Sequence, residues 1–441
     1  MSINSGLSAN KSGIQCLLGD LFEFEYGKSL TVKERKETGV FPVLGSNGVI
    51  GYHDKYLIKG PAIIVGRKGA VGEVTFIDRN FWPIDTSYYV KVSDSLDIKF
   101  SFYLLKSLIL GRLDKSTAIP GLNRNDAYVL TVMLLPLVEQ RAIVAKLEQL
   151  FSELDKGVEN LKKAQAQLKV FRQAVLKWAF EGKLTQEWRK QQKELPEKWK
   201  LLKLKDITNE KDGLRRGPFG SAIKKEFFVS DGYKVYEQGN AINNDPYRGT
   251  YYVSEEKFNE LINFKVVPGD LIVSCSGVTL GRISEIPEDA KPGIINQALL
   301  RIRLKQDLIK NKFFIIHFRA AFFQKMIFDQ SQGTAMPNLV GIKDFKEIEL
   351  LIPPIEEQDK IVQEIEDRLS VCDKLEETIS QSLQKAESLR QSILKKAFEG
   401  KLLTDAELEE VRKDPDWEPA EKLLERIQQE KQETQKTGKT K

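Results

Sequence analysis

The sequence PLVEQRAIVAKLEQLFSELDKGVENLKKAQAQLKVFRQAVLKWAFEGKL, residues 136–184, decides the architecture because the chain contains it twice. Residues 354–402 repeat it at a constant offset of 218 without a gap, and 20 of the 49 positions are identical. Both copies begin with proline, carry a Glu-Gln pair three residues later and end in Ala-Phe-Glu-Gly-Lys-Leu. Self-similarity at one fixed spacing indicates an internal duplication.

Hydrophobic residues recur every seven positions in both copies, which predicts two long helices that share a coiled-coil seam. In the first copy we expect one ladder of Leu147, Leu154, Leu161, Leu168 and Val175, and a second of Ile143, Leu150, Gly157, Ala164, Phe171 and Trp178. The second copy gives Ile365, Cys372, Ile379, Ala386 and Ile393, and a weaker ladder of Ile361, Leu375 and Leu389. A helix of about 43 residues would be roughly 65 Å long, which suits a spacer better than a single globular core.

The segments outside the repeats carry short β-branched and aromatic runs separated by Gly, Pro and Asn, which predicts strands. The expected fold class is therefore α+β, with two mixed α/β domains separated by two long helices. An apolar run predicts one further helix over Phe313–Phe328. The expected organisation is a flexible N-terminus (1–14), a first mixed domain (15–135), a helix (136–184), a second mixed domain (185–353), a helix (354–402) and a partly disordered charged tail (403–441) with a helix around Ala420–Glu433.

The composition narrows the possible functions. The chain has 441 residues, of which 41% are hydrophobic and 30% charged, and its net charge is +5. No apolar stretch approaches the ~18 residues of a membrane span, so we expect no membrane contact. Three widely spaced cysteines and only two histidines argue for the reducing cytoplasm and against a zinc or His-based centre. The positive charge permits nucleic-acid binding without proving it.

Three short motifs resemble catalytic signatures, but none has the complete pattern. Tyr26-Gly27-Lys28-Ser29 lacks the upstream glycine of a phosphate-binding loop. Asn244-Asp245-Pro246-Tyr247 has Asp where an amino-methyltransferase has a second Pro, and an Asx-Pro turn explains it better. Asp270 and Asp289 have loose spacing for a metal-dependent nuclease, whereas Pro268-Gly269-Asp270 is more simply a turn between strands. We therefore expect no active site in this chain.

Several longer stretches resemble one known family. FPVLGSNGVIGYHDKYLIKGPAIIVGRKGAVGEV (41–74) and FWPIDTSYYV (81–90) are similar to a target-recognition domain of the specificity subunits of type I restriction-modification systems. LPEKWKLLKLKDI (195–207) and GPFGSAIKKEFF (217–228) look like the opening of a second, divergent domain of this kind. The two repeats resemble the family's central and C-terminal conserved helices, so the resemblance covers nearly the whole chain.

The resemblance implies a non-catalytic subunit that recognises double-stranded DNA. Each target-recognition domain would read one half of a bipartite site, and the helices would pair as an antiparallel coiled coil that sets the spacer. Two modification (methyltransferase) subunits would bind the helices, and restriction subunits would join for translocation and cleavage. No cofactor is expected in this chain, because S-adenosylmethionine would belong to the modification subunit, and ATP and Mg to the restriction subunit.

Candidate DNA contacts follow from side-chain chemistry, since Arg, Lys, Asn and Gln read base edges whereas Ser and Thr hold phosphates. In the first domain the candidates are Ser46, Asn47, Arg67 and Lys68. In the second they are Arg215, Arg216, Ser221, Lys224, Lys225, Gln238, Asn240 and Ser276. Tight turns and an ordinary solvated basic surface explain these residues almost as well. Two other functions compete: a coiled-coil scaffold, which leaves two diverged domains unexplained, and an autonomous DNA-modifying enzyme, which lacks motifs.

Overall fold

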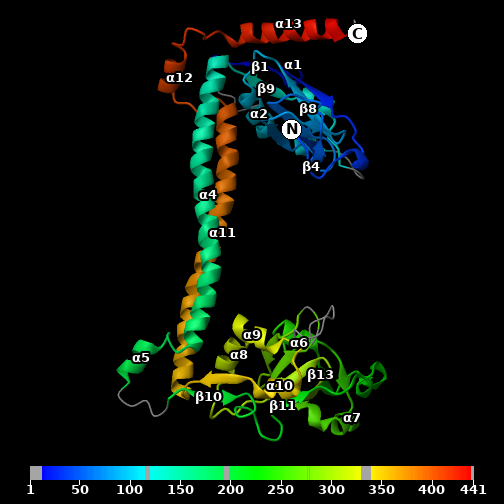
Figure 1. Cartoon of the computed structure of the whole chain (residues 1–441), viewed down its shortest axis with the longest axis vertical. Helices are drawn as coiled ribbons and strands as arrows, with labels where there is room; N and C mark the ends of the chain where they lie inside the picture. Colours follow the sequence, from blue (N-terminus) through cyan, green and yellow to red (C-terminus); the bar gives the residue numbers. More distant parts are fainter. Residues whose placement is uncertain are drawn as a thin grey trace. The chain divides into compact units, whose positions relative to one another are not determined.

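The computed structural model describes residues 12–114, 120–192, 198–275, 277, 279–328 and 339–438 (Figure 1). The chain divides into two compact units. Unit 1 comprises residues 1–162 and 380–441, and unit 2 comprises residues 163–379. Unit 1 is therefore built from both ends of the chain. Most of the predicted flexible N-terminus, residues 1–11, lies outside the described residues.

Unit 1 contains a four-stranded antiparallel sheet, a three-stranded sheet and a strand pair. In spatial order these are β2 (Phe22–Tyr26), β8 (Ser87–Val92), β5 (Ala62–Gly66) and β6 (Val74–Ile77), then β4 (Gly48–His53), β3 (Phe41–Gly45) and β7 (Trp82–Pro83), then β1 (Ile14–Leu17) with β9 (Thr131–Leu134). The short helices are α1 (Leu18–Leu21), η1 (Val32–Glu34), α2 (Ile98–Ser107), η2 (Leu110–Leu113) and α3 (Arg124–Tyr128). Phe24, Ile63 and Val65 are fully buried in the same core cluster as Phe100 and Leu104 of α2, and Ile63 and Val65 share one face of β5 because a strand has a period of two.

Unit 2 contains a four-stranded sheet, a five-stranded mixed sheet and a strand pair. These are β11 (Leu214–Arg216), β19 (Leu299–Ile302), β16 (Leu271–Ser274) and β17 (Ile283–Glu285), then β12 (Phe228–Val229), β14 (Tyr252–Val253), β13 (Tyr233–Tyr236), β18 (Gly293–Ile295) and β15 (Lys265–Val266), then β10 (Lys200–Lys203) with β20 (Glu349–Ile352). The helices are α5 (Gln186–Gln191), η3 (Gly220–Ala222), η4 (Lys225–Phe227), α6 (Gln238–Ile242), α7 (Glu255–Glu260), η5 (Ile262–Phe264), α8 (Asn311–Arg319), α9 (Ala321–Ile327) and α10 (Ile342–Glu347).

The four-stranded sheets of the two units share one plan. The order β2-β8-β5-β6 corresponds to β11-β19-β16-β17, and the register places Tyr26 opposite Tyr88 and Arg216 opposite Leu300. The next residue is glycine in both units, and a Cβ on Gly27 or Gly217 would overlap a backbone carbonyl oxygen of the neighbouring loop. The two sheets therefore end at equivalent tight turns.

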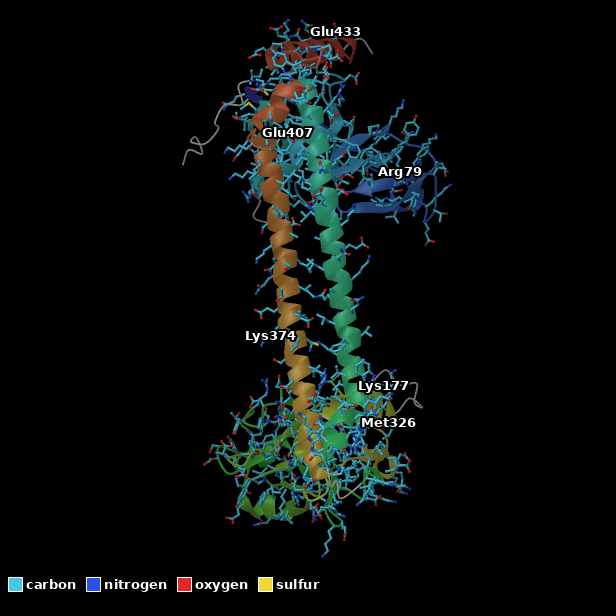
Figure 2. The ribbon with its side chains drawn as sticks, turned by 90° about the vertical axis from the view of Figure 1, so that its left-hand side faces the viewer. Arg79, Lys177, Met326, Lys374, Glu407 and Glu433 are labelled. Carbon is cyan, nitrogen blue, oxygen red and sulfur yellow. The ribbon has the colours of Figure 1, made fainter. Side chains whose placement is uncertain are left out.

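Each unit contains one end of both long helices, α4 (Leu137–Phe180) and α11 (Ile355–Phe398). In unit 2 Arg172 of α4 pairs with Asp373 at 2.6 Å and Glu376 at 3.0 Å. In unit 1 Arg390 of α11 pairs with Asp155 and lies 4.6 Å from the ring centroid of Phe151. Higher positions on α4 thus meet lower positions on α11, which confirms the antiparallel coiled coil (Figure 2).

One predicted ladder in each helix is confirmed, and the other is wrong beyond its first positions. In α4 the ladder is buried at Leu147 and Val175 and half-buried between them, and in α11 Ile365, Cys372, Ile379 and Ile393 are buried. In contrast, Phe171 is 40% exposed, Trp178 43%, Leu375 48% and Leu389 51%, and Gly157 is also exposed. The true second ladder is displaced by one residue, through Val144, Phe151, Arg172 and Ala179 in α4. Arg172 occupies a seam position because its stem packs there while its head finds acidic partners.

The predicted helix Phe313–Phe328 is also wrong, because the structure breaks it at Ala320. Ala320 is extended, with ψ of 137°, and separates α8 from α9. The Gln324 amide donates to the Phe318 carbonyl oxygen at 2.5 Å, and the Phe322 and Phe323 rings turn back onto His317. Tertiary packing of aromatic rings overrides the helical pattern here.

The C-terminal segment folds onto unit 1. It forms α12 (Asp405–Val411) and α13 (Ala420–Gly438), and Figure 1 shows α13 beside α1. Leu423 and Ile427 of α13 are fully buried in the core cluster of unit 1. The Lys431 ammonium donates to the Gly19 carbonyl oxygen at 2.8 Å. The tail is therefore part of the first mixed domain's packing.

Candidate nucleic-acid interface

In unit 1 the predicted DNA-contacting residues lie on two neighbouring turns. Ser46 and Asn47 form the turn between β3 and β4, and Arg67 and Lys68 follow β5. A Cβ placed on Gly69 would lie 3.1 Å from the Ser46 Oγ atom, so the two turns are in contact. Asn47 and Lys68 are exposed, and Ser46 and Arg67 are half-buried. The structure therefore brings all four residues to one place.

Two further residues join this group, and the sequence did not single them out as DNA contacts. The guanidinium carbon of Arg67 lies 4.8 Å from the ring centroid of Tyr26, and that of Arg124 lies 5.1 Å from it. Tyr26 is 47% exposed. Its position at the end of β2 and Arg124 at the start of α3 are about 100 residues apart, so only the tertiary fold reveals the contact.

In unit 2 most of the predicted residues lie on β11 or in the loop after it. Arg216, Ser221, Lys224 and Lys225 are exposed. The loop also carries Phe219, which is 90% exposed and which the sequence analysis missed. The flanking Pro218 and Gly220 were the signal, because they place an aromatic residue at the tip of a turn. Arg215 is half-buried, and its Nε atom lies 3.8 Å from an Asp212 carboxylate oxygen.

The remaining candidates of unit 2 lie elsewhere. Asn240 is 2% exposed, and its side-chain amide donates to the carbonyl oxygens of Asp245 and Arg248, at 3.0 and 2.7 Å. Asn240 therefore supports the loop after α6 instead of facing a base edge, since its hydrogen-bonding groups are used. Gln238 begins α6 and is half-buried. Ser276 lies outside the described residues.

A buried ion network lies directly behind β11. Arg303 binds both carboxylate oxygens of Asp270, at 2.7 and 2.8 Å, and one of Asp212 at 2.9 Å. Arg301 is fully buried and also pairs with Asp212. The hydrogen bonds that Arg303 donates to Asp270 raise the pKa of Arg303, whereas burial lowers the pKa of Arg301. The network fixes the segment that leads into Arg215 and Arg216.

This network also removes one catalytic alternative. Asp270 is fully buried and accepts from Arg303 and from the Val267 backbone N–H, so it is not placed as a metal ligand. Asp245 accepts from the Tyr247 backbone N–H at 3.0 Å, which is the predicted Asx turn. Among the described residues no group of three or more His, Cys, Asp or Glu side chains could hold a metal ion. The same part of the chain contains no helix long and apolar enough to cross a membrane.

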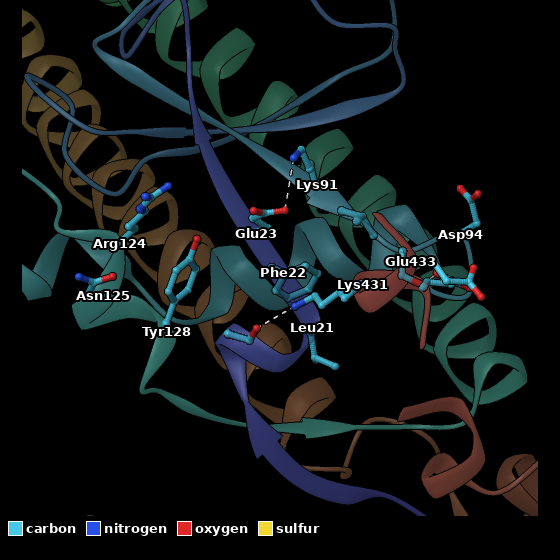
Figure 3. A pocket seen from close by; sticks show the side chains of 14 residues that line it. Leu21, Phe22, Glu23, Lys91, Asp94, Arg124, Asn125, Tyr128, Lys431 and Glu433 are labelled. Atoms are coloured by element: carbon cyan, nitrogen blue, oxygen red, sulfur yellow. Dashed lines mark hydrogen bonds and ion pairs between the residues drawn. The ribbon is translucent and has the colours of Figure 1, made fainter. Parts of the chain in front are cut away.

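A cavity of about 900 Å³ lies between the first domain and α13 (Figure 3). Arg124 and Tyr128 line one side, and Lys431 and Glu433 line another. Burial lowers the pKa of the Lys431 ammonium. The charged side chains that line the cavity have both signs, and Glu23 pairs with Lys91 at 3.3 Å. The cavity therefore favours neither an anion nor a cation.

Comparison with known proteins gives one consistent family. The model of the type I restriction modification DNA specificity domain matches residues 16–163 and 196–385. The type I restriction enzyme EcoBI specificity subunit of Escherichia coli is 29% identical over 279 residues, which are 60% of this chain and 57% of that protein. The MjaVIII specificity subunit of Methanocaldococcus jannaschii is 23% identical over 275 residues, 61% of this chain and 62% of that protein. The matches thus span less than two thirds of these relatives.

Solved structures share the fold at low sequence identity. The HsdS subunit from Thermoanaerobacter tengcongensis has a TM-score of 0.54 and 17% identity, with 89% of this chain and 97% of that chain covered. A chain from a structure on the complex assembly and conformational transition of the type I R-M system has a TM-score of 0.61 and 16% identity, with 89% and 98% covered. At these identities the likeness concerns the fold alone.

Proposed function

Because the chain belongs to the family of type I restriction-modification DNA specificity domains, we propose that it is the DNA sequence-recognition subunit of a type I restriction-modification complex. The family match confirms the resemblance found in the sequence. In this function each mixed domain reads one half of a bipartite site in double-stranded DNA, and the helices set the spacer between the halves. The chain supplies recognition and no catalysis.

The observation that carries this proposal is a shared scaffold with unlike surface groups. The turns after β5 and β16 correspond, because Gly72 donates to the Gly66 carbonyl and Gly281 to the Ser274 carbonyl. The exposed Tyr26 of unit 1 then corresponds to the exposed Arg216 of unit 2, and the half-buried Arg67 corresponds to Cys275, which is buried. Two domains that place different side chains on one frame suit the binding of two different DNA half-sites.

The long helices support the proposal that modification subunits bind them. Val170, Phe171 and Trp178 of α4 and Val371 and Leu375 of α11 are between 40% and 71% exposed. Large apolar side chains that stay outside a coiled-coil seam mark an interaction face. Two modification subunits, which would bring S-adenosylmethionine, fit the duplicated helices, and restriction subunits would bring ATP and Mg.

Base-level mapping of DNA methylation tests the proposal. Cells that carry this chain with its modification subunit should methylate one bipartite sequence. Lys68→Ala should weaken binding and alter only the first half of that sequence, and Lys224→Ala only the second, at a cost of about 1–3 kcal/mol if the contact is to a base. Arg79→Ala, an exposed arginine already paired with Asp78, is the matched control. Methylation without any shared sequence would contradict the proposal.

A further inference from the structure

The group of Tyr26, Arg67 and Arg124 in unit 1 has an arrangement that the general DNA-binding role does not explain. The three side chains come from the end of β2, the turn after β5 and the first residue of α3. Both guanidinium groups lie over one tyrosine ring, at 4.8 and 5.1 Å from its centroid. Cations approach aromatic faces in this way because the ring carries negative charge density on its faces.

The backbone locks these elements together. The Leu122 N–H donates to the Arg67 carbonyl oxygen at 2.9 Å, so the segment that leads to Arg124 is tied to the turn that carries Arg67. The buried Tyr88 hydroxyl donates to the Leu122 carbonyl oxygen at 3.0 Å. The Tyr88 ring lies 5.1 Å from the Tyr26 ring and supports it from the sheet. The two arginines are therefore positioned before any ligand arrives.

Neither arginine is neutralised within the described part of the chain. Arg67 donates to the Asp85 backbone carbonyl at 2.9 Å, and Arg124 donates to the Phe24 backbone carbonyl at 2.8 Å. These acceptors are uncharged, and no described carboxylate lies within 4.0 Å of either guanidinium. By contrast, Arg172, Arg303 and Arg390 are all paired with carboxylates. Two ordered, partly exposed and uncompensated guanidinium groups form a site for an anion that binds from outside.

We propose that Tyr26, Arg67 and Arg124 form a receptor for the phosphodiester backbone of the DNA half-site that unit 1 reads. The inference rests on the proposed function and deepens it by assigning this group to backbone phosphates instead of base edges. A base edge offers no charge to two guanidiniums, whereas phosphate oxygens accept charge-assisted bonds from both. Tyr26 is a positioning residue, because its ring holds the two cations.

The test uses the full chain with its modification subunits and two duplexes, one with the mapped methylated sequence and one without it. Arg124→Gln should reduce the slope of log affinity against log salt by about 0.9, equally on both duplexes, and leave the methylated sequence unchanged. Tyr26→Leu should act in the same direction. Arg124→Lys and Tyr26→Phe keep the charge or the ring, so they should retain the wild-type slope, as should the paired control Arg79→Gln.

Neutral methylphosphonate linkages locate the contact. Replacing one phosphate at a time should reveal a position in the first half-site at which the wild-type chain loses affinity and the Arg124→Gln chain does not. An unchanged salt slope in Arg124→Gln, or a changed methylated sequence, would overturn the receptor. A wild-type chain that binds both duplexes equally would contradict the proposed function instead, and the slopes on the second duplex would still decide on the receptor.

Discussion

The starts of the two long helices are held in the same way by segments from different parts of the chain. At α11 the buried Glu357 accepts from Thr185 at 2.6 Å, from the Trp199 indole at 2.8 Å and from Arg189. At α4 the buried Glu139 accepts from Ser12 at 2.8 Å, from Arg412 at 3.1 Å and from the Trp417 indole at 3.3 Å. Trp199 and Trp417 are separated by 218 residues, the offset of the helical repeat.

This comparison extends the duplication beyond the repeated helices. The segment between α4 and the second domain supplies the three partners of Glu357, whereas the C-terminal segment supplies the arginine and the tryptophan that bind Glu139. The units differ after the tryptophan. The chain continues from Trp199 into strand β10, but from Trp417 into helix α13, which packs on unit 1. Unit 1 therefore depends on the last residues of the chain, and unit 2 does not.

Ending the chain at Leu402 should have the largest effect. It removes Arg412 and Trp417 from Glu139, and it removes the buried Leu423 and Ile427 from the core of unit 1. An unpaired buried charge costs about 3–5 kcal/mol and each lost core side chain about 2–5 kcal/mol, which together rival the stability of a domain. Hydrogen exchange should show unit 1 unprotected and unit 2 unchanged. Full protection of β2 and β8 would contradict the dependence.

Single substitutions of the two glutamates sharpen the comparison. Glu139→Ala should destabilise unit 1, and Glu357→Ala unit 2, each by about 3–5 kcal/mol, because the remaining arginine and indole lose a buried partner. Denaturant unfolding monitored separately for each unit by hydrogen exchange measures both effects. The surface variant Glu410→Ala serves as the control, since Glu410 forms an ion pair with the exposed Lys413. Equal losses of stability in both units from either substitution would show that the two glutamate sites do not act independently.

The confirmed ladder of α11 and the wrongly predicted one should behave differently when they are truncated. Ile365 is 1% exposed and Leu375 is 48% exposed. Ile365→Ala should therefore cost about 2–5 kcal/mol of stability, whereas Leu375→Ala should cost under about 0.5 kcal/mol and instead weaken binding of the modification subunit. Thermal unfolding measures the effect on stability, and titration with the modification subunit measures the effect on binding. A large loss of stability in Leu375→Ala would show that Leu375 packs in the seam after all.

Only unit 2 contains a buried histidine. Burial among aromatic rings lowers the pKa of His317 to about 3, against an ordinary value near 6.5. The unfolded chain binds the proton first, so the stability of unit 2 should be complete above pH 6.5 and fall by about 1.4 kcal/mol per pH unit as the pH drops below it. His317→Leu should remove that slope. Unfolding of unit 2 at several pH values measures this slope. The same slope in His317→Leu would show that protonation of His317 is not its cause.

The sequence predicted those features that repeat or alternate regularly. The duplicated helices, one ladder in each, and strands such as β5 and β8 follow from periodicity and residue type. The displaced ladder could not be predicted, because Phe171 and Trp178 have the same hydrophobic character whether they face a helix or a partner protein. Tyr26 and Arg124 were missed because their contact depends on a fold that joins β2 to α3, and Asn240 was overestimated because its burial is a tertiary property.

Exchange of the first recognition domain tests whether the two domains read DNA independently. Residues 15–135 and 403–441 are replaced together by those of another specificity subunit, so that α13 keeps a matching surface, and methylated sites are then sequenced. If each domain reads DNA through its own surface groups, one half of the methylated sequence should change while the other half and the spacer remain. A chimera in which both halves change together would contradict it.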